Sequence, residues 1–234
     1  MASGPASAST RSPPVVMGGQ GILPPRTTPG AGASSGPVVV TGEVLSMEKL
    51  KLRAENMRKE WLRSKDDKEL YSTADELLVI TPGAGRTITQ VNIDYVAANC
   101  KAVELRPIIE MMAHLHKKKK VSTTDIESAM ADVIESIDSF ACDNPRVFHY
   151  VGELFCAFAN DNILTLDWLC DNANKVMGDE FKYKVVEEAM KSVRYNFGED
   201  AVMSFFGGKN EMDAIEKLLG PTKAKELTKC HHII

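Results

Sequence analysis

The sequence predicts an all-α protein of stacked antiparallel helical hairpins, similar to HEAT repeats, that follows a disordered N-terminal arm. Beyond residue 43, apolar residues recur every three or four positions, as in amphipathic helices, and no segment shows the alternation of a strand. Short polar or Gly- and Pro-containing breaks separate the periodic segments. Because short connections favour antiparallel neighbours, the pattern indicates a pile of helical hairpins.

The first 43 residues differ in composition from the rest of the chain. They hold 8 of the 16 glycines and 7 of the 11 prolines, no aromatic residue and only three charged side chains, Arg11, Arg26 and Glu43. Such a segment buries too little apolar surface to offset the entropy of ordering its backbone, about 1 to 2 kcal/mol per residue. We therefore expect a disordered arm over residues 1–43.

Three helices are expected before residue 104. Apolar residues at alternating spacings of three and four from Met47 to Trp61 predict an amphipathic lead helix. Two more helices are expected near 67–80 and 88–103. The capping-box pattern Thr87-x-x-Gln90 predicts the start of the second.

The middle of the chain has the clearest helical periodicity. Residues 108–115 follow the i, i+3, i+4, i+7 pattern, with Pro107 acceptable in the first turn. The N-cap cluster Ser122–Asp125 precedes an apolar stripe over residues 126–137. A third helix is predicted with Asn144 as N-cap and Pro145 as the first helical residue.

The remaining helices are separated mainly by glycines. They are expected at about 164–176, 180–195, 199–206, 212–219 and 223–229. Gly178, Gly198 and the pair Gly220-Pro221 separate several of them. The large residues of the central helices, Phe148, Leu154, Phe155 and Trp168, are expected to form much of the core, since neighbouring helices direct them to one side.

The composition argues against several classes of protein. The chain has 28 Lys and Arg against 32 Asp and Glu, a formal charge of −4, so its surface as a whole is not suited to nucleic acid. No apolar run approaches the roughly 18 to 20 residues of a membrane-spanning helix. The first 19 residues also lack the charged start and apolar block of a signal peptide. A cytosolic or nuclear setting is indicated.

The sequence contains no recognisable catalytic or metal-binding pattern. It lacks the Gly-rich phosphate-binding loops, the Gly-x-Ser-x-Gly nucleophile motif and the His-Glu-x-x-His zinc motif. The cysteines are odd in number and never form a Cys-x-x-Cys pair; they are Cys100, Cys142, Cys156, Cys170 and Cys230. We interpret them as small buried hydrophobic residues. The sequence thus predicts a protein that is not an enzyme and has no cofactor or metal.

Four consecutive lysines, Lys117, Lys118, Lys119 and Lys120, end one of the predicted helices. Lysines in a last turn interact favourably with the negative end of the helix dipole and stay solvated. Alternatively, they contact an RNA backbone weakly, although no interleaved aromatic residue offers base stacking. Both interpretations are compatible with the sequence.

The segment Asp138–Pro145 joins two strongly amphipathic helices. Asp143 lies just before the second helix, where its charge would favour the positive end of the dipole, so a capping role is one interpretation. In the other, Asp138 and Asp143 flank a short corner and present a paired negative surface to basic residues of a partner.

Residues 121–176 carry a series of motifs in a definite order. The helix start Ser122–Asp125 and an amphipathic helix precede the corner Asp143-Asn144-Pro145. The next helix has the form aromatic-x-Tyr-Val-x-Glu-Leu (Phe148–Leu154), and after a polar turn another helix begins at Ile163–Leu166. In this order the segment resembles the second half of the MA3 domain of eukaryotic translation initiation factor 4G and of programmed cell death protein 4. The corner and the following helix are more similar to factor 4G.

The resemblance implies an MA3-type stack of helical hairpins that binds the DEAD-box RNA helicase initiation factor 4A during translation initiation in the cytoplasm. In the family, an acidic residue four positions before the corner Asp commonly shares in this binding. Ser139 occupies that position here and Asp138 is its neighbour. We therefore expect a partner-binding surface of Asp138, Asp143, Asn144 and Pro145.

These interpretations divide the chain into an arm (1–43), lead helices (44–104), an MA3-like domain (105–195) and a C-terminal helical extension (196–234). Two functions are compatible with the sequence. The first is a non-enzymatic scaffold or regulator of translation initiation that binds the helicase. The second is a helical adaptor that binds RNA, for example mRNA, or another protein through the basic run 117–120.

Overall fold

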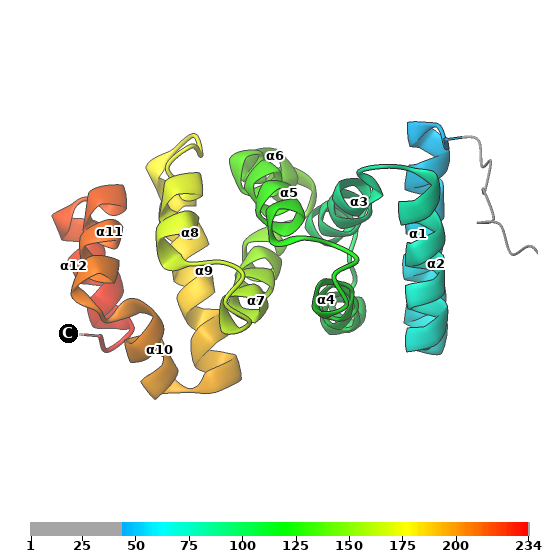
Figure 1. Cartoon of the computed structure of the whole chain (residues 1–234). Helices are drawn as coiled ribbons and strands as arrows, with labels where there is room; N and C mark the ends of the chain where they lie inside the picture. Colours follow the sequence, from blue (N-terminus) through cyan, green and yellow to red (C-terminus); the bar gives the residue numbers. More distant parts are fainter. Residues whose placement is uncertain (1–43, 234) are drawn as a thin grey trace, which may run out of the picture. The chain divides into compact units, whose positions relative to one another are not determined.

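The computed structural model describes residues 44–233, which form twelve α-helices and no strand (Figure 1). The predicted all-α fold is thereby confirmed. The expectation of a disordered arm falls on residues 1–43, outside the described residues. Within residues 44–233, no helix has both the length and the apolar character needed to span a membrane.

The helices match the predicted segments closely over most of the chain, and α2 and α10 have the predicted bounds. Between α5 and α7 the structure has a further short helix, α6, where the sequence predicts only a corner. In chain order the helices are α1 (Met47–Ser64), α2 (Asp67–Ile80), α3 (Ala84–Ala98), α4 (Ala102–Lys117), α5 (Thr123–Glu135), α6 (Ile137–Asp143), α7 (Val147–Asn160), α8 (Leu166–Ala173), α9 (Asp179–Phe197), α10 (Glu199–Phe206), α11 (Lys209–Leu219) and α12 (Pro221–Cys230).

Two predicted helix starts differ from those observed. The prediction of a capping box at Thr87 and Gln90 was wrong, because α3 begins earlier, at Ala84. The residue before it, Gly83, has a φ of 79°, a backbone conformation that glycine adopts readily. The Gln90 amide instead donates to Asp94 within the helix. Pro107 lies inside α4 rather than in its first turn, because α4 begins at Ala102.

The predicted N-cap cluster before α5 is confirmed as a capping box. The Ser122 hydroxyl accepts a hydrogen bond from the Asp125 N–H at 3.1 Å, and the Asp125 carboxylate accepts one from the Ser122 N–H at 2.9 Å. Two of the unpaired N–H groups at the helix start are satisfied in this way. The start of α5 therefore follows from local sequence alone.

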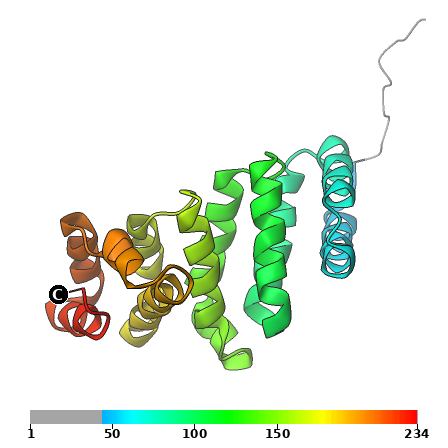
Figure 2. The ribbon, with the colours of Figure 1, turned by 90° about the horizontal axis from the view of Figure 1, so that it is seen from below.

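The helices pack both on their immediate neighbours and on the next but one along the chain. Consecutive pairs include α1 with α2 and α11 with α12, and contacts between α1 and α3, α3 and α5, and α7 and α9 join these pairs into a stack (Figure 2). Residues 44–233 all belong to one compact unit. The expected boundaries at 104/105 and 195/196 lie within α4 and α9.

Helix α7 forms the centre of the core. It packs against α3, α4, α6 and α9, and it is buried over most of its length. The expected core residues Phe148, Leu154 and Phe155 are buried, whereas Trp168 of α8 is only partly buried. The apolar face that the sequence predicted for α7 is thus confirmed. Residues outside this face, such as Tyr150 and Cys156, are buried as well.

Gly152 allows α7 and α9 to approach each other closely. A Cβ atom added at Gly152 would lie 2.6 Å from the carbonyl oxygen of Glu188 and 3.0 Å from Oγ of Ser192, both on α9. Real Cβ atoms do not approach backbone this closely, so any larger residue would push the two helices apart. A glycine inside a helix costs about 1 kcal/mol relative to alanine. The contact with α9 therefore gives a packing reason for glycine here.

We predict that Gly152→Ala destabilises the protein although alanine favours helix. Overpacking of a core typically costs about 1 to 3 kcal/mol, which exceeds the gain in helix propensity. Thermal unfolding followed by circular dichroism should show a melting temperature lower by a few degrees. The control is Glu135→Ala, at an exposed position on α5 away from the contact between α7 and α9. A Gly152→Ala protein as stable as the wild type would contradict the packing argument.

Candidate functional site

The predicted acidic corner lies on and after α6, a helix of seven residues. Asp138 is in its first turn and Asp143 is its last residue. Five residues correspond to a rotation of about 140° around a regular helix. The two residues therefore lie on different sides of α6 and do not share one face of this helix.

The sequence predicted Asn144 as the N-cap of α7 and Pro145 as its first residue. The structure shows that both predictions were wrong. Asn144 ends α6, Pro145 lies in the turn, and α7 begins at Val147. The Asn144 side chain accepts a hydrogen bond from the Arg146 N–H at 3.1 Å and donates one to the Ala97 carbonyl at 2.8 Å. Ala97 lies in the last turn of α3, where carbonyls lack intrahelical partners. Asn144 thus ties the corner to α3.

Asp143 is an exposed charge that local structure does not explain. It lies at the C-terminal end of α6, where the helix dipole disfavours a negative charge, so the predicted favourable dipole contact was wrong. Over residues 44–233 its carboxylate has no hydrogen bond or ion pair. Asp138 is partly buried, and its carboxylate accepts a hydrogen bond from the adjacent Ser139 N–H at 2.8 Å.

The four lysines at the end of α4 do not act as one patch. Lys120 forms an ion pair with Asp75 of α2, and the Lys118 ammonium lies 5.6 Å from the centre of the Tyr71 ring, also on α2. Lys117, Lys118 and Lys119 are exposed. Lys118 and Lys120 both lie against α2, and the ion pair of Lys120 reduces the positive charge available for an RNA backbone.

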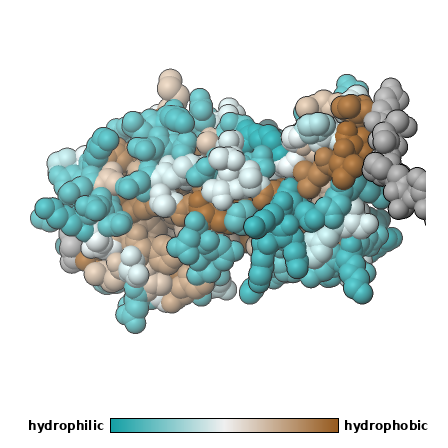
Figure 3. Space-filling model, in the orientation of Figure 1, coloured by the Kyte–Doolittle hydropathy of each residue, from teal (hydrophilic) through white to brown (hydrophobic). Residues whose placement is uncertain are grey.

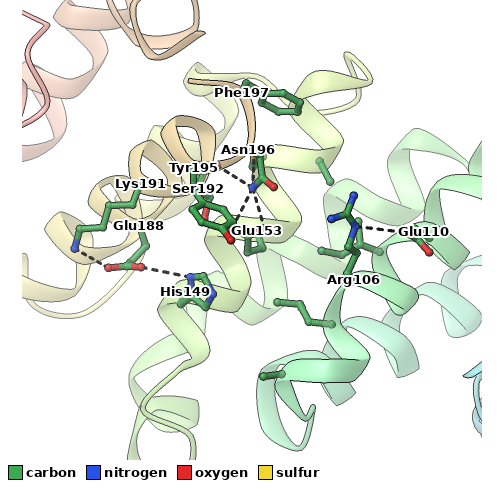
Figure 4. A pocket seen from close by; sticks show the side chains of 15 residues that line it. Arg106, Glu110, His149, Glu153, Glu188, Lys191, Ser192, Tyr195, Asn196 and Phe197 are labelled. Atoms are coloured by element: carbon green, nitrogen blue, oxygen red, sulfur yellow. Dashed lines mark hydrogen bonds and ion pairs between the residues drawn. The ribbon is translucent and has the colours of Figure 1, made fainter. Parts of the chain in front are cut away.

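The described residues also form a groove of about 960 Å³, which the sequence did not predict. Residues of α4, α7 and α9 line it (Figure 4). Its apolar part includes Leu105 and Ile109 of α4 and Ala157 of α7. Tyr195 and Phe197 at the end of α9 add aromatic surface and are 87% and 44% exposed. The face of the molecule in Figure 3 combines hydrophilic surface with stretches of hydrophobic surface across its middle and toward the upper right.

Charged residues of the groove are connected across helices. Glu188 of α9 lies 2.8 Å from the Lys191 ammonium and 3.8 Å from Nδ1 of His149 on α7 (Figure 4). Burial alone would lower the pKa of Lys191, but its hydrogen bonds to Glu188 and Glu187 raise it, so Lys191 stays charged at neutral pH.

The other charges of the groove are arranged differently. Arg106 and Glu110 form a pair on α4 with 3.5 Å between Nε and Oε1. The two carboxylate oxygens of Glu153 accept hydrogen bonds from the Asn196 amide at 3.2 and 3.1 Å (Figure 4). On α9, Glu188, Ser192 and Asn196 recur every four residues, which is the sequence signal that could have indicated one polar face.

No group of three His, Cys, Asp or Glu side chains between residues 44 and 233 could hold a metal ion. Burial raises the pKa of Cys100, Cys156 and Cys170 to about 12, so these thiols are protonated at neutral pH and are poor nucleophiles. Cys142 and Cys230 are exposed, so the prediction that all five cysteines are buried was wrong for these two.

Comparison with protein-family models found no matching family, and comparison with curated proteins found no significant match.

We predict that Asn144 stabilises the corner through its bond to α3. Asn144→Ala leaves the buried Ala97 carbonyl without its partner, which typically costs about 1 to 3 kcal/mol. Asn144→Asp keeps the acceptor for the Arg146 N–H but removes the donor to Ala97. Both variants should therefore unfold at a lower temperature. Wild-type stability in Asn144→Asp would show that the bond between the helices contributes nothing.

We further predict that two of the five thiols react readily in the native protein. Cys142 and Cys230 are exposed, whereas the other three are buried and protonated. Titration with a chromogenic disulfide reagent at pH 7.5 should release about two equivalents rapidly and five after denaturation. Rapid release of more than two would mean that a thiol of the core is accessible and reactive.

Proposed function

We propose that the protein is a non-enzymatic scaffold or regulator of translation initiation that binds the DEAD-box RNA helicase initiation factor 4A in the cytoplasm. The proposal rests on the resemblance of residues 121–176 to an MA3 domain. The observation that carries it is the exposed, unpaired Asp143 at the junction of α6 and α7, in the Asp143-Asn144-Pro145 motif of that resemblance.

The junction suits recognition of a basic surface. Asn144 holds the backbone next to Asp143 against α3, while the carboxylate of Asp143 remains in water. A charge on a fixed backbone loses little entropy when a partner binds. Complementary charges also speed association and discriminate against wrong partners, with an effect that decreases as salt increases.

Asp143 and Asp138 are not expected to contribute equally to the proposed helicase contact. Asp143 is exposed and unpaired among the described residues, whereas Asp138 is partly buried and bonded to Ser139. We therefore assign the main contact to Asp143 and a smaller one to Asp138. RNA binding through residues 117–120 is less favoured, because Lys118 and Lys120 already interact with α2.

We predict that charge reversal at the corner weakens helicase binding without unfolding the protein. Asp143→Lys should weaken the affinity for initiation factor 4A by about tenfold or more, Asp138→Lys by less, and the double variant by the most. Affinity is measured by fluorescence anisotropy at two salt concentrations and stability by thermal unfolding. At the C-terminal end of α6, Asp143→Lys should leave stability unchanged or slightly raised.

The matched control is Glu216→Lys, an exposed position on α11. It should leave the affinity unchanged. Unaltered helicase affinity in a folded double variant would remove the corner as the binding site. If the wild type failed to bind the helicase but bound single-stranded RNA with a steep salt dependence, the adaptor function would replace the scaffold function.

A further inference from the structure

We propose that the groove between α4, α7 and α9 binds an amphipathic helix of a partner protein that carries a Lys or Arg opposite Glu153. This inference is independent of the proposed helicase contact, because it rests on different residues. The α6–α7 corner contributes none of the groove lining.

The shape of the groove suits a helix. Helix α7 packs against both α4 and α9, and all three helices contribute residues to the lining. Helix α7 therefore forms the floor of the groove, and α4 and α9 form its two walls (Figure 4). A volume of about 960 Å³ lies at the upper end of the range of ligand pockets and holds several side chains. Grooves between helices commonly accept the apolar face of another helix, read at positions i, i+3, i+4 and i+7.

The apolar lining supplies the driving force for such binding. Ile109 and Ala157, both only partly buried, give an aliphatic surface, and Tyr195 and Phe197 add exposed aromatic rings. Aromatic residues are enriched where proteins bind one another, because they bury a large area with few rotatable bonds. Covering these side chains with the apolar face of a helix removes them from water.

The charged residues that line the groove determine which charge a partner's side chain should carry there. Within the groove, Glu110 is paired with Arg106, and Glu188 shares the Lys191 ammonium with Glu187, which does not line the groove. Glu153 has no cationic partner among residues 44–233 and is held by the neutral amide of Asn196. The groove therefore keeps one uncompensated negative charge, which a Lys or Arg of the partner would neutralise.

A guanidinium is the better match to this carboxylate. Asn196 fixes Glu153 through both of its oxygens, and arginine can donate two parallel hydrogen bonds to a carboxylate held in one orientation. The same charge disfavours phosphate groups, so nucleic acid is a poor occupant. Within the described residues there is no strand whose edge could accept an extended peptide.

The test uses the full chain and a phage-displayed library of 16-residue helical peptides with randomised positions i, i+3, i+4, i+7 and two flanking sites. Selected peptides are synthesised, and their affinity is measured by fluorescence anisotropy. We expect selected peptides to share an apolar face and at least one Lys or Arg. Their affinity should fall about tenfold or more with Ala157→Arg, which fills the groove, and about threefold or more with Glu153→Gln.

Two control variants make the result specific. Glu135→Gln removes an exposed carboxylate on α5 and should not change the affinity. The double variant Asp138→Lys/Asp143→Lys should also bind the peptides normally, which separates this surface from the helicase contact. Thermal unfolding shows whether each variant is folded. If Ala157→Arg does not fold, Glu153→Gln still tests the proposal, because glutamine has nearly the same shape as glutamate.

Three results would overturn the proposal. The first is a selection that yields no peptide with measurable affinity for the wild type. The second is equal binding to the wild type and to a folded Ala157→Arg protein, which would place the peptides elsewhere. The third is equal binding to the wild type and Glu153→Gln, which would show that the uncompensated carboxylate does not take part in recognition.

Discussion

The close approach of α7 and α9 at Gly152 is the contact on which the described structure depends most. A side chain at this position would meet the α9 backbone at Glu188, so only glycine lets the two helices reach their observed separation. Helix α7 also packs against α3, α4 and α6, so its position is transmitted to most of the central helices. The loss of helix propensity at a glycine is offset by the packing that it permits.

Both candidate binding surfaces are built on this central helix. The corner with Asp143 precedes the N-terminus of α7, and the groove runs along the side of α7 between α4 and α9. They share no residue, and they differ in physical character. The corner offers a solvated charge on a fixed backbone, which favours fast and salt-sensitive association. The groove offers apolar surface around one uncompensated carboxylate, which favours a larger buried contact.

Much of the fold was predictable because local sequence determines helices. The period of apolar residues located eleven of the twelve helices, and the capping box at Ser122 and Asp125 fixed the start of α5. The errors occurred where two local signals compete. Thr87-x-x-Gln90 has the form of a capping box, but Gly83 ends the preceding turn and lets α3 begin earlier. Asn144 is a good N-cap by type, yet it ends α6 because its amide bonds to α3.

The sequence by itself determined the all-α class, the approximate extent of most helices and the apolar face of the central ones, because these depend on residues within a few positions of one another. Only the tertiary structure decided that Lys120 pairs with Asp75, that Asn144 bonds to Ala97 and that Glu153 faces Asn196. These partners are 43 to 47 residues apart in the chain. An apolar stripe indicates that a helix face is buried but not which helix covers it, so charges and grooves formed between helices follow only from the packing.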